Sequence, residues 1–250
     1  MVRDILTVVA CVLAAIGGLL LLEKRWPALN RREHNEIIGW QLSVLGAVYS
    51  VMLGFMLYTV WTNFQLAKQN VGAEANSLVN VSRLANGLPA EQRNTMQALA
   101  RSYADLMVHK EWPDMEQSRL TPESHAVMIR MWRTLTSVQP SNAGQASSLD
   151  HAQTELSSMT EHRRLREVQI FDRLPGLLWT VLISGAALLL FCCTLLGARS
   201  AWIHMVLIGS LAFLLALLLI TISSVDRPLQ GWIRVSPAAF QRAAASLQEE

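Results

Sequence analysis

The ionisable side chains with the clearest chemistry lie in the middle of the chain, around Glu74. This acid stands among small residues in the segment VGAEANS, residues 71–77, where a buried carboxylate needs a cationic partner. Arg83 is too far along the same predicted helix to be that partner. A later segment offers a cluster of basic residues, namely Arg163, Arg164, Arg166 and Arg173. We therefore predict an interhelical ion pair that acts as a structural clamp, with an ion-binding site as the alternative.

A second group of polar side chains surrounds Glu111. His109, Asp114 and Glu116 lie within a few residues of it, and carboxylate oxygens could hold a divalent cation. The spacing matches no known cation-binding loop, so capping of a helix end before Trp112 is the favoured interpretation. We expect neither a bound metal nor a cofactor.

The apolar parts of the chain offer no catalytic group of residues. An intramembrane enzyme needs a nucleophile with a base, or a metal site, but His204 stands alone and no acid accompanies Ser184 or Thr194. The absence of Asp, Glu, Lys and Arg from these stretches also argues against a transporter with an intramembrane proton or cation relay. We predict that the protein is not an enzyme, and the polar side chains of its apolar stretches fit a passive conduit better than a pump.

The stretch 37–67 carries the residues that could line such a conduit. Its small side chains recur at helical spacing at Ser43, Gly46, Ala47, Ser50 and Gly54. Small faces let helices approach closely, so packing within one subunit is the simplest interpretation, with a subunit interface or a pore lining as alternatives. A bulkier stripe that faces lipid or narrows a pore comprises Val51, Phe55, Tyr58 and Thr62.

Four long uncharged stretches must position these residues, namely Ile5 to Leu22, Ile37 to Ala67, Leu174 to Ala198 and Ser200 to Val225. Each can cross a bilayer, which takes about 17 to 25 helical residues, and a backbone in hydrocarbon must be hydrogen-bonded internally. The chain is 52% hydrophobic and only 16% charged, against about 25% charged in soluble domains. We predict an all-α membrane protein with four transmembrane helices, two before and two after an inserted helical extramembrane domain.

The predicted division of the chain is 1–64 for the first transmembrane pair, 65–173 for the helical domain, 174–225 for the second pair and 226–250 for an amphipathic tail. The second span should continue as one helix from Ile37 to Asn86, ending at the turn that contains Pro89. Further helices are predicted over 89–111, 122–138 and 149–172. Asp226 and Arg227, held near the membrane border, are predicted to fix how the tail folds back.

Charge and location constrain the partners. Residues 68–173 contain 12 basic and 12 acidic side chains, so no basic patch indicates nucleic acid. Basic residues of the short loops are nearly balanced between the two sides, whereas those flanking the inner spans favour a cytoplasmic domain. We expect a multi-pass protein of the bacterial inner membrane whose termini and central domain are cytoplasmic.

Taken together, pieces spread over nearly the whole chain resemble the bestrophin-like family of bacterial and plant membrane proteins. These pieces are His34-Asn35-Glu36, the span with Gly46, Tyr49 and Gly54, Glu74-Ala75, Tyr103, Glu111-Trp112, Arg163-Arg164-Arg166, Asp226-Arg227-Pro228 and Gly231.

The resemblance implies a two-plus-two helix layout and a distant similarity to bestrophins, which are pentameric anion channels. No calcium-binding acidic cluster of the bestrophin kind is recognisable in the tail, so calcium gating is not implied. The leading hypothesis is an oligomeric passive channel for small inorganic anions, lined by the second span. The alternative is a non-conducting membrane scaffold or sensor whose long helical domain binds a partner.

Overall fold

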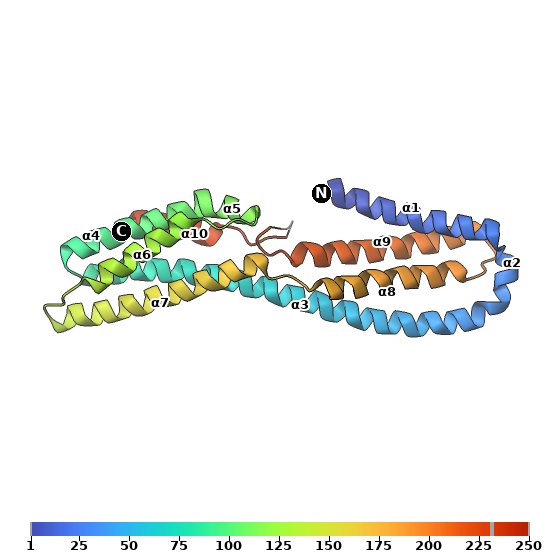
Figure 1. Ribbon diagram of the computed structural model, residues 1–250, viewed down its shortest axis with the longest axis horizontal. Coiled ribbons are helices and arrows are strands. Elements are labelled where there is room, and N and C mark those ends of the chain that lie inside the picture. Colours follow the sequence, from blue (N-terminus) through green and yellow to red (C-terminus); the bar gives the residue numbers. More distant parts are fainter. Residues whose placement is uncertain (1, 231–232, 250) are drawn as a thin grey trace. The chain divides into compact units, whose positions relative to one another are not determined.

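The computed structural model describes residues 2–230 and 233–249, and over these ranges the chain forms helices and no strands (Figure 1). Gly231, one of the residues behind the family resemblance, lies outside the described residues. The chain divides into two compact units, residues 1–62 with 174–226 and residues 63–173 with 227–250. Each unit is thus built from two separate segments of the chain.

The first unit contains the four membrane spans. They are α1 (Val2–Arg25), the first part of α3 (Asn35–Leu84), α8 (Gly176–Leu195) and α9 (Ala201–Val225). Helix α9 packs against both α1 and α8 (Figure 1). All four are long and apolar enough to cross a membrane, so the protein is an integral membrane protein and the predicted all-α class is confirmed.

Polar contacts join the two short connections at one end of this unit. The first connection contains α2 (Ala28–Arg31) and the 3₁₀ turn η1 (Arg32–His34). Asn35 donates its side-chain amide to the carbonyl of Gly197 at 3.0 Å and accepts the Gly197 N–H at 2.8 Å. The buried Arg31 donates to the carbonyl of Thr194 and lies 3.5 Å from Glu23. These contacts satisfy helix-end carbonyls that hydrocarbon would leave unbonded.

Within the described residues, the second unit is a helical bundle formed by the remainder of α3 and five further helices. After the 3₁₀ turn η2 (Ala85–Gly87), these are α4 (Ala90–Leu106), α5 (Trp112–Glu116), α6 (Pro122–Thr136), α7 (Ala143–Phe171) and α10 (Ala238–Glu249). A π-helical segment, η3 (Met107–Glu111), joins α4 to α5. The core side chains are mainly Leu, Met and Ala, with a few aromatic rings.

The helix boundaries in this unit differ from the predicted ones at three points. The chain stays helical through Trp112-Pro113 as far as Glu116, with Pro113 in the first turn of α5 directly after the π-helical segment. Helix α7 begins at Ala143, where Asn142 caps it by accepting the Gln145 N–H at 2.9 Å. Helix α6 starts at Pro122 as expected and ends at Thr136, two residues early.

The carboxyl-terminal segment, residues 227–250, packs within the second unit. The fully buried ring of Phe240 on α10 lies 6.3 Å from that of Tyr103 and 6.2 Å from that of Trp112, measured between centroids. Ala243 and Leu247 on the same face are also buried. The apolar stripe of the predicted amphipathic segment is therefore part of this core.

Candidate functional site: an uncovered face of α3 and a buried ion-pair network

The small residues of the second span form a strip that no other described helix covers. Ser43, Ala47, Ser50 and Gly54 are exposed in the chain, and Gly46 is half-exposed at the edge of the strip. At about 100° per residue, the first four fall within an arc of about 60° on the helix surface. A Cβ atom added to Gly46 or Gly54 would meet no described atom within 4 Å outside its own helix.

The two serines of this strip bond to their own helix. Ser43 Oγ donates to the Gly39 carbonyl at 2.9 Å and Ser50 Oγ donates to the Ala47 carbonyl at 2.8 Å. Their lone pairs still face outward, which makes the strip weakly polar and narrow in cross-section. Such a surface suits close contact with another subunit or with a small solute.

The bulkier stripe on the same helix is also exposed. Val51, Phe55 and Tyr58 keep 59%, 66% and 68% of their surface accessible. The opposite side of α3 makes the contact with α8, where the hydroxyl of the buried Tyr49 donates to the Leu182 carbonyl at 2.8 Å. Helix α3 is thus attached along one side, and both predicted stripes lie on the free side.

The second unit encloses a network of ionised side chains around Arg166. Its Nε donates to Glu74 at 2.7 Å, and its Nη2 donates to Glu111 at 2.8 Å and to Glu74 at 3.1 Å. All three side chains are fully buried. Two methionine sulfurs complete the surroundings, with Met115 Sδ 2.8 Å and Met107 Sδ 3.6 Å from the guanidinium nitrogens.

Arg163 extends this network by one turn of α7. Its Nη1 donates to the hydroxyl of Tyr103 at 2.9 Å and to Glu111 at 3.2 Å, while Nη2 lies 2.7 Å from the half-exposed Glu167. The Tyr103 hydroxyl in turn donates to Glu74 at 2.6 Å, and Ser124 donates to Glu111. The buried set holds two acids and two arginines, so its formal charge is zero.

The electrostatic environment of the network favours the ionised form of Glu111. Burial alone would raise the pKa of Glu111, but the charges of Arg166 and Arg163 and the Ser124 hydrogen bond outweigh it and lower that pKa. The pKa of Tyr103 is raised, first by burial and then by the charge of Glu74, so its phenol remains a donor. A neutral, hydrogen-bonded arrangement of this kind can be buried without a large loss of folding free energy. Removal of one partner would leave an uncompensated charge in the core and destabilise the fold.

The local sequence explains which arginines point inward. The buried positions of α7 are Ala152, Leu156, Met159, Arg163, Arg166 and Ile170. They recur at spacings of four, three, four, three and four, which is one face of a helix. Arg164 falls outside that face and pairs at the surface with Glu161 at 2.9 Å. Arg173 comes after the helix and donates to Gln230 at 3.1 Å.

The π-helical segment places Glu111 in the network. A π-turn inserts one extra residue into a helix and so rotates the next helical turn about the axis. Here the segment ends at Glu111, with Trp112 and Met115 buried just beyond it. The Glu111 side chain therefore does not cap a helix end, and it does not form a cation site with His109, Asp114 and Glu116. His109 contacts Asp105 at 2.9 Å, Asp114 bonds to Arg119 and Thr121, and Glu116 pairs with Arg234.

The remaining predicted site residues lie elsewhere. In the first unit, Asp226 accepts the backbone N–H of Leu174 at 2.9 Å, and in the second unit Arg227 is exposed. Sequence reasoning missed Tyr103 and Ser124 as members of the ion-pair network. Extending the apolar spacing of Ala152, Leu156 and Met159 along α7 would have identified Arg163 and Arg166 as its inward-facing arginines. No group of three or more potential metal ligands occurs within the described residues.

Comparison with known proteins identifies similar chains. Residues 9–240 match the family model described as a bestrophin-like domain. The fold is similar to a point mutant of a bacterial bestrophin homolog from Klebsiella pneumoniae, with a TM-score of 0.72, 14% identity and coverage of 99% of this chain and 98% of that one. A form of the same homolog solved by Zn-SAD phasing gives 0.69 and 16%, covering 98% and 97%.

A variant described as a membrane protein gives a TM-score of 0.72 and 14% identity, covering 100% of this chain and 98% of that one. No curated protein sequence matches. At these identities the structural likeness establishes the fold.

Proposed function

Because this chain belongs to the bestrophin-like family, we propose that it is an oligomeric passive ion channel that conducts anions through a pore lined by the membrane part of α3. The observation that carries the proposal is the uncovered strip of small residues on that helix. Gly54 and its neighbours leave room for a close approach by another chain or by a solute. Helix packing within one chain does not use this room.

The need for several copies arises from the size of the membrane unit. Four helices packed side by side enclose too little space for a hydrated ion, so a conduit requires copies arranged around an axis with equivalent faces turned inward. The free side of α3 is available for that arrangement, and its contact with α8 lies on the other side. The family resemblance favours a pentamer.

Passive conduction of anions fits the composition of the spans. Pumps and coupled transporters rely on ionisable residues within the membrane, and cation channels are commonly lined by rings of Asp or Glu. The four apolar stretches contain neither acids nor Lys or Arg. Under this proposal the protein has no enzymatic activity. We place it in the bacterial inner membrane with the second unit in the cytoplasm, which the basic residues flanking the inner spans support.

The test combines chloride flux from proteoliposomes with the stoichiometry of the same sample measured by native mass spectrometry. Gly54→Leu places a bulky side chain on the strip, so we expect flux to fall at least tenfold, on the order of the effect of blocking a narrow pore, while the oligomer persists. The matched control is Gly18→Leu on α1, where the added side chain also meets open space. It should leave flux unchanged.

The opposite outcome is equally informative. A monomer or dimer without chloride flux would contradict the channel and leave the non-conducting scaffold as the working hypothesis. Equal loss of flux in Gly54→Leu and Gly18→Leu would contradict the assignment of the pore to α3.

A further inference from the structure

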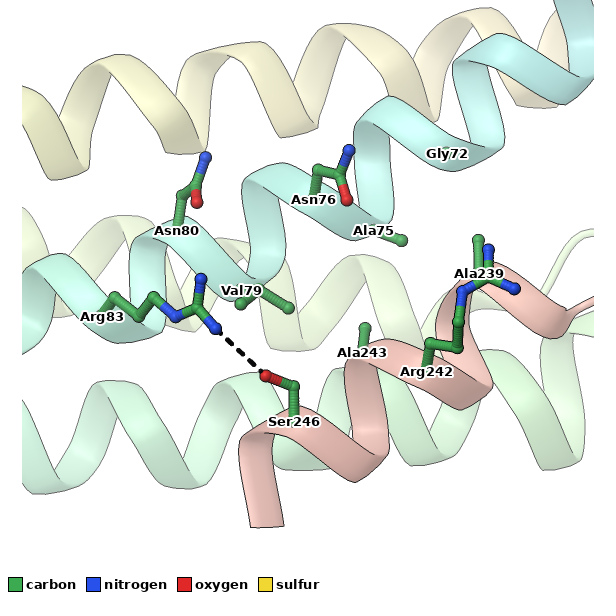
Figure 2. A pocket seen from close by; sticks show the side chains of 10 residues that line it. All are labelled: Gly72, Ala75, Asn76, Val79, Asn80, Arg83, Ala239, Arg242, Ala243 and Ser246. Carbon is green, nitrogen blue, oxygen red and sulfur yellow. Dashed lines mark hydrogen bonds between the residues drawn. The ribbon is translucent and has the colours of Figure 1, made fainter. Parts of the chain in front are cut away.

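Helices α3 and α10 of the second unit border an open groove (Figure 2). Its volume is about 490 Å³, and its walls are formed by residues 72–83 of α3 and 239–246 of α10. A recess of about 400 Å³ adjoins it, sharing Gly72, Ala239 and Arg242 with the groove. Together they form one concave surface, which we term the α3–α10 groove.

The side chains that line the α3–α10 groove carry charge of one sign. Among the described residues, four cations line it, namely Lys68, Arg83, Arg234 and Arg242, and none of the lining residues is acidic. Of these, Arg234 pairs with Glu116 at 2.7 Å. By contrast, residues 68–173 as a whole hold equal numbers of acids and bases. A concave surface lined by one sign of charge concentrates the field and attracts counter-ions.

The two guanidinium groups that define the groove come from different helices. Arg83 projects from α3 toward α10, where its Nη2 lies 3.3 Å from the hydroxyl of Ser246, and Arg242 projects from α10 (Figure 2). Guanidinium groups match the geometry of phosphate and carboxylate oxygens through paired hydrogen bonds. An oxyanion in the groove would therefore be held from both walls.

Small residues keep the groove hollow. Gly72 and Ala75 on α3 and Ala239 and Ala243 on α10 are among the residues that line it (Figure 2), and a Cβ added to Gly72 would meet no described atom within 4 Å. A seam that served only to pack two helices would be filled by larger apolar side chains. The space is thus unexplained by packing.

The amino end of α10 adds to the positive potential. The recess is bordered by Ser236, Ala238 and Ala239, which include the first residues of this helix of 12 residues. The first N–H groups of a helix have no partner within it and carry a partial positive charge, so helix starts bind anions. This contribution is independent of the four cationic side chains.

We propose that the α3–α10 groove is a binding site for a multivalent oxyanion of the phosphate class. Its volume exceeds the needs of a single chloride ion, and cationic side chains line it from both helices, with Lys68 on α3 and Arg242 on α10. The bound group is either a small soluble phosphate compound or the phosphate of a lipid headgroup. Binding is measured directly, so the test does not depend on ion conduction.

The experiment titrates purified full-length protein in detergent with inorganic pyrophosphate by isothermal calorimetry. We expect saturable binding of one pyrophosphate per chain, weakened when salt rises from about 0.05 M to 0.5 M because screening shortens the reach of the charges. Arg242→Gln should raise the dissociation constant at least about tenfold, since it removes a charge-assisted hydrogen-bonding group. Gly72→Leu retains every charge but fills the groove, and should weaken binding to a similar degree.

The matched control is Arg130→Gln, which removes an exposed cation on α6, outside the groove. It should change the dissociation constant by less than about twofold. A parallel arm places the protein in nanodiscs with and without phosphatidic acid, and Arg242-dependent binding in that arm alone would assign the site to a lipid phosphate. Absence of Arg242-dependent binding in both arms, or equal weakening by Arg130→Gln, would overturn the proposal.

Discussion

In the membrane unit the buried side chains are almost all apolar, whereas the second unit encloses two carboxylates and two guanidinium groups. Among the described residues of the membrane unit, Arg31 is the one fully buried charge, and it lies at a helix end where it bonds to a carbonyl. In the second unit, Arg166 lies in the core between Glu74 and Glu111. One helix, α3, contributes to both units.

This difference has a physical reason. Lipid provides neither water to solvate a charge nor a hydrophobic driving force between helices, so helices in it associate through close packing and small residues. An aqueous unit gains free energy from apolar burial and can enclose charges that compensate one another. The stability of such a core therefore depends on every member of the network, because an unpaired charge left in it is strongly destabilising.

The largest effect should come from removing the centre of the network. Arg166→Met leaves two buried carboxylates without their main cation, so we expect the second unit to lose about 3 to 5 kcal/mol of unfolding free energy. Denaturant unfolding followed by tryptophan fluorescence would measure this loss. Arg164→Met on the same helix, where the pair with Glu161 is exposed, should cost less than about 1 kcal/mol. Similar costs for the two variants would refute the role assigned to burial.

The membrane unit should be more sensitive to added volume than to lost charge. A Cβ at Gly197 would lie 2.5 Å from the Ala28 carbonyl oxygen and 2.7 Å from the Arg32 nitrogen, both backbone atoms. Gly197→Ala should therefore cost about 1 to 3 kcal/mol, seen as a lower midpoint in thermal unfolding of detergent-solubilised protein. Gly39→Ala, where no described atom lies within 4 Å, is the control and should be neutral or slightly stabilising.

The smallest effect concerns pH and belongs to the second unit alone. Because the folded-state pKa of Glu111 lies below its usual value, ionised Glu111 contributes stability that is complete above about pH 4.3, the ordinary pKa of a glutamate. That contribution is lost as pH falls through the lower folded-state pKa. Unfolding free energy measured against pH should fall less steeply in Glu111→Gln below about pH 4.3. Identical slopes would show that Glu111 has no such shift.

The membrane spans were predictable because hydrocarbon imposes a simple rule on sequence. A charged residue within a span is costly, so the limits of the uncharged stretches predict the helices closely: Ser200 to Val225 is α9 within one residue. The exact ends depended on contacts that the sequence does not display. Helix α8, for example, ends at Leu195, where Arg31 bonds to Thr194 and Asn35 bonds to Gly197.

The buried network was only partly predictable. The small residues around Glu74 indicated that this acid needs a cationic partner. The identity of that partner could not be predicted from composition, because Arg163, Arg164 and Arg166 are chemically alike and composition does not show which of them points inward. Only their positions around the axis of α7 distinguish the two buried arginines from the exposed Arg164. The inward position of Glu111 depends on the π-helical segment over Met107–Glu111, which was not predicted from the sequence. Thr121 directly precedes α6, but its hydroxyl donates to Asp114 and does not cap the helix.

The burial of Phe240 against Tyr103 and Trp112 has a consequence for biosynthesis. The core that these rings share is made of residues 63–173 together with α10, and helices α8 and α9 are translated in between. Both later membrane helices are therefore translated before Phe240. Until Phe240 is translated, the rings of Tyr103 and Trp112 lack their partner, so the second unit can complete its core only after α8 and α9 have been translated.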